Sequence, residues 1–275
     1  MVINMNLEIN DLMLEQYKIS FNIFSDQSYI IYDNGNFTDK FLKVLLGINK
    51  PEFGEVLYNK TNVFDHKEYF KKRIYLDCTK KYLSTLTPSI INDILNYKYN
   101  LSFNSSKFKK VVDDLNVRKG TKVSSLYQFT KEANTCVNYA LLKGLEKDLV
   151  FINEPLIHLN DKQVKDYILN ELFNKKIYQT VIIKTNNLED YIQKPVKIIW
   201  FANTDVYVID PNKDKFILVM TELDIKKCIY TYQNGFKVCY DLTKEELKIL
   251  SENKVKYKEI SFSEMFKLKK RFLNE

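Results

Sequence analysis

The strongest candidate for a catalytic residue is the carboxylate Glu154. It lies between Asn153 and Pro155, just after the apolar run at 149–152. A carboxylate at the end of a buried strand can serve as a general base if a water and an electrophile are held beside it. Asn153 has only a neutral amide oxygen, whereas a hard cation such as Mg²⁺ prefers carboxylates. Glu154 is therefore either a catalytic base or a carboxylate that structures an interface.

The thiols and imidazoles of the chain do not show the spacing of a metal site. No two cysteines form a CxxC pair, and the chain has only two histidines, of which His158 lies in the loop after Glu154. Zinc sites are built from closely spaced Cys and His ligands. We therefore expect no metal site and four reduced, structural thiols: Cys78, Cys136, Cys228 and Cys239.

Composition predicts a soluble cytoplasmic protein with a substantial core. Of its 275 residues, 45% are hydrophobic and 28% charged, and no apolar run approaches the ~20 residues that span a bilayer. The N-terminus also lacks the order of a secretory signal. The net charge is +7, but the lysines are spread along the chain, often beside Asp or Glu. This pattern indicates a solvated surface and no nucleic-acid partner.

Short apolar runs alternate with longer amphipathic stretches, which is the pattern of an α/β protein. Two of the runs, 148–153 and 180–185, show no clear alternation and suit parallel strands covered on both faces. Further strands are expected at 18–23, 28–32, 54–59, 72–77, 196–201 and 205–210, and helices at 39–48, 65–72 and 161–173, with a mostly helical middle over 88–145.

A polar turn, "PNKDK" at 211–215, is the candidate domain boundary. We expect a main domain at 1–210, with a helical subdomain at about 84–145. Residues 211–275 then form a small C-terminal α+β appendage, with strands in "KFILVM", "KCIYTY" and "FKVCYD" and helices in "TKEELKILSEN" and "SFSEMFKLKKRF".

Several stretches, taken in order, resemble the nucleotide-binding subunit of an ABC transporter, in particular the type that exports drugs or antimicrobial peptides. "YDNGNFTDKFLKVLLGINKPEFGEVLYN" (32–59) resembles GxNGxGKST followed by LLKxLLGxxKPxxGEV. "TLTPSIINDIL", "DLVFINEPLIHLND" and "TVIIKTNNLEDY" resemble LTVxENL, LLILDEPTxGLDP and TVIISTHDLEE, and the tail "ISFSEMFKLKKRF" resembles an exporter extension. The resemblance covers nearly the whole chain and implies a P-loop NTPase-like α/β core.

The residues that bind phosphate and Mg²⁺ in this family are replaced in the present sequence. A phosphate loop needs glycines for backbone approach, a lysine for the β- and γ-phosphates, and a hydroxyl for Mg²⁺. In the loop Asn34–Gly35–Asn36–Phe37–Thr38–Asp39, Phe37 replaces a glycine, Thr38 the lysine and Asp39 the hydroxyl. Lys40 is out of register with the lysine position at Thr38, and Phe41 follows it where a hydroxyl is needed, so it is not a displaced phosphate lysine. Loss of the lysine's charge-assisted hydrogen bonds alone costs roughly 1.5–3 kcal/mol.

The other functional positions of the family pattern also carry different residues. Asn153 replaces the aspartate of the Mg²⁺ shell, Asn186 the γ-phosphate histidine, and Cys78 a glutamine that binds metal and attacking water. Asn160 replaces the aspartate of the loop after the catalytic strand. The signature LSGGQ aligns with "LYQFT", whose glycines are gone: Leu126, Tyr127, Gln128, Phe129 and Thr130. Of these catalytic positions, the one that keeps the family's residue is Glu154, which we regard as a remnant of the site.

The family's adenine-stacking aromatic has no clear counterpart, since Tyr17 abuts the first long strand. We expect Tyr17 to pack in the core or on the surface, and we expect no cofactor, ATP and Mg²⁺ included.

The resemblance implies a pseudo-ATPase that lies at the cytoplasmic face of the membrane and pairs with a permease. A second ABC ATPase subunit or a second copy of the chain is a further expected partner. Two alternatives stay open: a soluble regulatory or immunity adaptor that uses the old dimer surface, and a weak nucleotide binder with residual activity. Enzymatic activity therefore remains undecided between loss and a slow or unconventional nucleotidase.

Overall fold

The fold was analysed in a computed structural model. The residues that the structure describes are 6–32, 37–80, 94, 103–115, 131–174, 180–202, 205–221, 225, 227–232 and 235–273.

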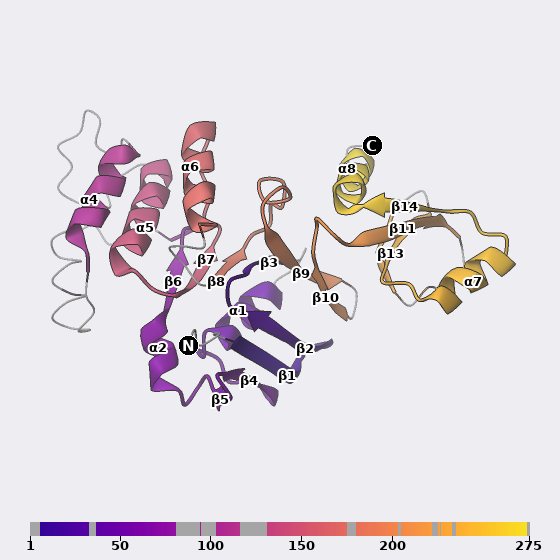
Figure 1. Ribbon diagram of the computed structural model, residues 1–275, viewed down its shortest axis with the longest axis horizontal. Helices are drawn as coiled ribbons and strands as arrows, with labels where there is room; N and C mark the ends of the chain where they lie inside the picture. The colour runs from indigo at the N-terminus through magenta and orange to yellow at the C-terminus, as the bar shows by residue number, and fades with distance from the viewer. Residues whose placement is uncertain are drawn as a thin grey trace.

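A six-stranded sheet forms the centre of the molecule (Figure 1). Its order is β10 (Asp205–Ile209), β9 (Val196–Ala202), β3 (Ser28–Tyr32), β8 (Thr180–Lys184), β7 (Leu149–Asn153) and β6 (Arg73–Asp77). All neighbouring strands are parallel except β10, which pairs antiparallel with β9. Every residue of β3, β7 and β8 is buried. This confirms the expectation that the unalternating runs form parallel strands covered on both faces.

Successive residues of the central strands pack into two different cores. In β3, Ile30 belongs to the core under helices α4 (Ser105–Asp114), α5 (Lys131–Leu145) and α6 (Lys162–Leu172). The next residue, Ile31, belongs to the core on the opposite face, beneath α1 (Phe37–Leu45). The side-chain alternation of a strand thus places each residue toward a known layer.

The second core is closed by an antiparallel sheet of order β2 (Tyr17–Phe24), β1 (Asn6–Leu14), β4 (Phe53–Tyr58) and β5 (Thr61–Asn62). Strand β1 was not predicted from the sequence, although Leu7, Ile9 and Leu12 are buried. Its alternation is broken at Asp11, where the pairing with both neighbours shifts and φ is +46°. The short helix α2 (Lys67–Lys72) leads from this region into β6.

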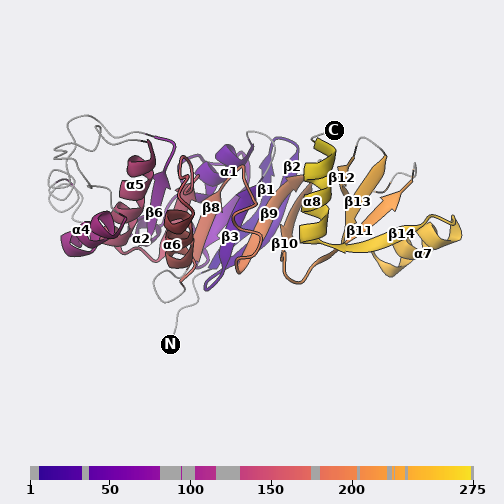
Figure 2. The same cartoon turned by 90° about the horizontal axis from the view of Figure 1, so that it is seen from above.

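A third sheet follows the turn after β10. Its order is β12 (Cys228–Thr231), β13 (Phe236–Tyr240), β11 (Lys215–Met220) and β14 (Tyr257–Ser261). Helix α8 (Phe262–Leu273) lies between this sheet and the central one (Figure 2), and its Phe262 packs 6.0 Å from the ring of Trp200 on β9. Helix α7 (Lys244–Glu252) covers the other face, with Leu250 beside Val219. The division of the chain at residue 210 remains a prediction.

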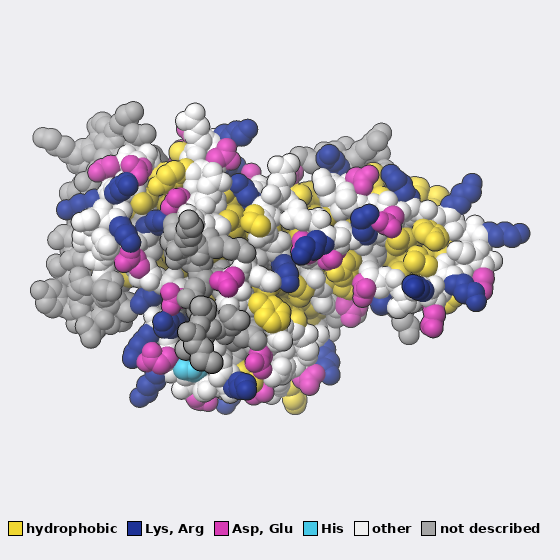
Figure 3. All heavy atoms as spheres, in the orientation of Figure 1, with side chains coloured by type: hydrophobic (Ala, Val, Ile, Leu, Met, Phe, Trp, Pro, Cys, Tyr) yellow, Lys and Arg dark blue, Asp and Glu magenta, His cyan; other side chains and the backbone are white. Residues whose placement is uncertain are grey.

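The described surface mixes both signs of charge. On the face in Figure 3, Lys and Arg side chains are interspersed with Asp and Glu. Among the described residues, no helix has both the length and the apolar character that crossing a bilayer requires.

Two glycines with similar backbone angles allow a matched test of the β1–β4 packing. Gly54 has φ +79° and Gly235 has φ +82°. A Cβ at Gly54 would overlap the backbone of Asp11 and Leu12, whereas a Cβ at Gly235 has no described atom within 4 Å.

We expect Gly54→Ala to lower the free energy of unfolding by about 3 kcal/mol or more, because backbone strain and overlap add. Gly235→Ala should cost only about 1 kcal/mol, the strain alone. Urea unfolding of both variants measures the difference. Equal losses would contradict a close approach of β4 to the β1 irregularity.

Candidate functional site

The candidate site lies at the carboxyl edge of the central sheet, where Asn153 ends β7. Asp77, Asn153 and Lys184 are the last residues of β6, β7 and β8, and they are register partners across the three strands. The crevice beyond the carboxyl ends of parallel strands is where open α/β sheets bind ligands. Asn153 and Lys184 alternate with Ile152 and Ile183 of the helical face, so their side chains point toward the α1 face.

Lys184 forms the central contact of the site. Its Nζ lies 2.7 Å from Oδ1 of Asp39, in the first turn of α1. The lysine side chain is 11% exposed and the aspartate side chain 54% exposed. An ammonium taken almost fully out of water needs a partner of opposite charge. Asp39, which the sequence resemblance aligns with the family's Mg²⁺ hydroxyl, therefore neutralises a lysine on β8.

Lys184 was not singled out from the sequence. The signal was present, because "TVIIKT" carries one charged residue in a run that otherwise reads as buried on both faces. Lys and Asp are almost never fully buried unless they are paired. A lysine in such a strand therefore predicts a carboxylate partner, although it does not say which one.

Asn153 bonds to Asp77 instead of to a cation. Its Nδ2 donates to Oδ1 of Asp77 at 2.9 Å, and the same oxygen accepts from the backbone N–H and hydroxyl of Thr79. The Oδ1 of Asn153 is buried and accepts no hydrogen bond within the described part of the chain. Asp77, also not singled out from the sequence, brings a second carboxylate to the edge.

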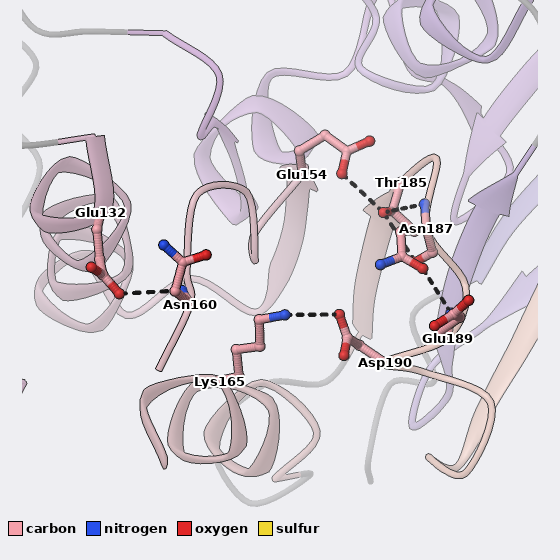
Figure 4. Close-up of polar contacts among 8 residues, drawn as sticks. All are labelled: Glu132, Glu154, Asn160, Lys165, Thr185, Asn187, Glu189 and Asp190. Carbon is pink, nitrogen blue, oxygen red and sulfur yellow. Dashed lines mark hydrogen bonds and ion pairs between the residues drawn. The ribbon is translucent and has the colours of Figure 1, made fainter. Parts of the chain in front are cut away.

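Glu154 is held in place by two donors, of which Figure 4 shows the Thr185 hydroxyl. Its Oε2 accepts from the Thr185 hydroxyl at 2.9 Å, and its Oε1 accepts from the backbone N–H of Asn186 at 2.7 Å. Its own N–H donates to the Lys184 carbonyl at 2.9 Å, with φ at +51°. The carboxylate thus ties the end of β7 to the end of β8. A group fixed in this way can orient a water or stabilise the loop.

The first residues of α1 pack their side chains against the protein core. Thr38 is buried, and the Phe37 ring packs edge-on to Tyr17 with centroids 5.0 Å apart. Tyr17 is itself 4% exposed and also packs on Phe201. Of the two placements expected for Tyr17, core or surface packing, the structure shows the core. Lys40 forms an ion pair with Glu15 away from the site, which agrees with the view that it is not a displaced phosphate lysine.

The remaining predicted positions lie around this centre. Cys78 is buried, its N–H donates to the Asn153 carbonyl at 3.0 Å, and burial raises the pKa of its thiol. Asn160 is exposed, and its backbone N–H donates to Glu132 at 3.3 Å (Figure 4). His158 is exposed with φ +65°. Asn34, Gly35, Asn36 and the signature residues 126–130 lie outside the described residues.

The described charges at the edge are mostly negative. The carboxylates of Asp39, Asp77 and Glu154 meet one ammonium, that of Lys184. Asp77 and Asp39 also raise the pKa of Tyr75 on β6, after burial, which is the larger cause. Among the described residues no group of three or more His, Cys, Asp or Glu is arranged to hold a metal ion.

A double-mutant cycle on Asp39→Asn and Lys184→Met tests the ion pair. We expect a coupling energy of about 1–2 kcal/mol in urea unfolding, since one partner is nearly buried and the other half exposed. The control cycle is Glu15→Gln with Lys40→Met, a pair whose side chains are 39% and 58% exposed. That pair should couple by less than about 0.5 kcal/mol. Similar coupling in both cycles would mean that the contact at the sheet edge is incidental.

Comparison with known proteins identifies solved structures that have a similar fold. No protein-family model matches the sequence, and no curated protein sequence does. Solved structures do match. A structure described as the ATP-binding subunit of an ABC transporter aligns with a TM-score of 0.62 and 20% identity, over 74% of this chain and 89% of its own. The structure of cbiO1 from Clostridium perfringens, part of the ABC transporter complex cbiONQ, aligns with a TM-score of 0.53 and 17% identity, over 73% and 86%.

A third match is a bacterial Atm1-family ABC exporter with ATP bound, with a TM-score of 0.60 and 12% identity. It covers 75% of this chain but 39% of that longer chain. At these identities the likeness concerns the fold alone. The chain has the P-loop NTPase-like α/β fold of ABC transporter ATP-binding subunits.

Proposed function

We propose that this chain is a catalytically degenerate ABC-type nucleotide-binding subunit that acts through protein contacts and does not hydrolyse ATP. The observation that carries the proposal is the ion pair between Asp39 and Lys184 at the start of α1. In the family pattern this region supplies a lysine and a hydroxyl to phosphate and Mg²⁺. Here the carboxylate and the ammonium satisfy each other.

The described residues do not fit Mg-ATP. A triphosphate needs an excess of positive charge, from a lysine, a metal ion and backbone N–H groups. At this edge three carboxylates, Asp39, Asp77 and Glu154, outnumber the single ammonium. To bind a phosphate, Lys184 would have to leave Asp39 or share its charge with it. Either route weakens attraction for the ligand.

Steric packing points the same way. Phe37 stands where the family has a glycine, and its ring packs on the buried Tyr17. A glycine allows backbone to approach a ligand closely, and a phenylalanine does not. The side chain that replaces this glycine is thus used for core packing.

Glu154 is better explained as a structural carboxylate than as a base. A general base must lie within hydrogen-bonding reach of a water that is itself aligned on an electrophile. Its two oxygens instead accept hydrogen bonds from Thr185 and Asn186, and so connect the end of β7 to the residues after β8. Among the described residues, this arrangement favours a structural role for Glu154 at the edge of an ATPase-like sheet.

The retained fold favours a membrane permease as partner, at the cytoplasmic face of the membrane. Two of the matching structures are parts of transporters, namely a cbiONQ component and an Atm1-family exporter. A drug or antimicrobial-peptide exporter is the type of system that the sequence resembles most. A second ABC ATPase subunit or a second copy of this chain would complete the pair across the dimer surface.

The second candidate is a soluble regulatory or immunity adaptor that uses the same surface without a permease. The feature that favours it is the C-terminal sheet, which packs through α8 on the central sheet and gives the chain an additional surface. The two candidates differ in whether the chain is found with an integral membrane protein.

A single substitution separates a structural from a catalytic Glu154. We expect Glu154→Gln to lower the free energy of unfolding by roughly 1.5–3 kcal/mol, because one donor then faces an amide NH₂. We expect it to leave the background rate of ATP hydrolysis unchanged. The control is Glu52→Gln, an exposed position that should alter neither quantity. Turnover in the parent chain that disappears in Glu154→Gln would overturn the proposal.

Purification of the tagged chain from detergent-solubilised membranes of its own host tests the partner. We expect a protein with several membrane-spanning helices to copurify in a fixed ratio, and mass spectrometry identifies it. Recovery only from the soluble fraction, with a soluble partner, would replace the permease by the adaptor.

A further inference from the structure

Two cysteines of the C-terminal sheet lie directly opposite each other. Cys228 on β12 is the register partner of Cys239 on β13, its antiparallel neighbour. β12 is an edge strand of this sheet. The two sulfurs are not joined by a disulfide in this structure. Neither belongs to the candidate site at the edge of the central sheet, since they lie in a different sheet.

The pairing places the two cysteines at a position suited to a cross-strand bond. The Tyr240 N–H donates to the Lys227 carbonyl at 3.1 Å, so Lys227 and Tyr240 form a hydrogen-bonded pair. The next pair along, Cys228 and Cys239, is therefore a non-hydrogen-bonded pair, in which Cα atoms lie about 4.5 Å apart. Disulfides span Cα separations of about 4.4–6.8 Å. The register shifts beyond this pair, between Cys228 and Tyr230, but the separation typical of such a pair lies within the range that a disulfide spans.

The two thiols differ in their exposure. Cys239 is fully buried in the core beneath α7, beside Val219 and Leu250. Cys228 is half-buried at the sheet edge. Its Sγ lies 3.3 Å from Oγ1 of Thr231 and donates to the Tyr230 carbonyl at 3.3 Å. A reagent from solution therefore meets Cys228 first.

We propose that Cys228 is a thiol-modification site that reacts with low-molecular-weight disulfides, and that Cys239 resolves the adduct to give a Cys228–Cys239 disulfide. In the first step the Cys228 thiolate attacks a sulfur of the small disulfide. A new S–S bond forms, the old one breaks, and one small thiolate leaves. In the second step Cys239 loses its proton and attacks Cys228 Sγ, and the second small thiolate leaves. Two protein thiols are oxidised and one small disulfide is reduced to two thiols.

The environment assigns the order of the steps. The Cys239 thiol donates a hydrogen bond to the Cys228 sulfur, which lowers the pKa of Cys228 and raises the pKa of Cys239. Thr231 and the charge of Lys237 act on Cys228 in the same direction. The thiolate is the nucleophile, so the half-buried sulfur is also the more reactive one. Once Cys228 carries an adduct, the nearest available thiol is Cys239.

The other two cysteines provide an internal control. Cys78 and Cys136 are buried, and burial raises the pKa of each thiol, to about 12 for Cys136. Cys136 lies on helix α5 and Cys78 directly follows β6, so among the described residues neither faces a cysteine across a strand pair. Both should stay reduced in the folded chain under conditions that oxidise the pair.

The experiment treats the reduced full-length chain with oxidised glutathione near pH 7, followed by acid quenching, alkylation and peptide mass mapping. We expect a peptide pair joined through Cys228 and Cys239, with Cys78 and Cys136 alkylated only after denaturation. Cys228 should react at least about 10-fold faster than Cys136. Cys239→Ser should stop at a glutathione adduct on Cys228, and Cys228→Ser should leave Cys239 unmodified over the same period.

Two results would overturn the proposal. One is a glutathione adduct that persists on Cys228 of the parent chain without the internal disulfide, as in Cys239→Ser. The other is a reaction of Cys228 no faster than that of Cys78 or Cys136. Both comparisons can be read from the parent chain, so they stand even if a serine variant folds poorly.

Discussion

An ammonium group that is almost buried must lie beside a carboxylate, because a lone charge in that position would be strongly destabilising. In this chain Lys184 is that ammonium and Asp39 that carboxylate, at 2.7 Å. The pair joins the end of β8 to the first turn of α1, the helix that follows the stretch resembling a phosphate loop. Beside this pair, Asn153 donates to Asp77, and Glu154 accepts from Thr185 and Asn186.

The pair can exist only because the sheet brings its members to one edge. Strands β3, β7 and β8 are parallel and buried on both faces, so the ends of all three open on the same side. Helix α1 returns over the face that carries Ile31, and this places Asp39 within reach of the lysine. The apolar core thus determines where the polar groups meet, while the polar groups determine what the edge can bind.

Much of this fold could be predicted from the sequence. The unalternating runs at 148–153 and 180–185 lie in neighbouring parallel strands, and the helix expected at 161–173 is α6. Strand β1 was missed because an irregularity at Asp11 interrupts its alternation. β14 was missed because its sequence, "YKEIS", is polar apart from Ile260 and the terminal Tyr257.

The candidate site was harder to predict, because contacts across strands depend on register. Spacing along the chain aligned Asp39 and Asn153 with family positions, but it gave no sign that Lys184 would pair with Asp39. The contact joins residues 145 positions apart in the sequence, and only the three-dimensional register brings them together. The same is true of Cys228 and Cys239, whose spacing matched no known motif yet whose strands pair them directly.

The central claim is that the Asp39–Lys184 edge has no place for Mg-ATP. Isothermal titration calorimetry of the purified chain with Mg-ATP tests it most directly. The account predicts no saturable heat up to millimolar ATP. Binding tighter than about 100 μM, roughly −5.5 kcal/mol, would contradict it, since Lys184 would then have to leave Asp39 for a phosphate.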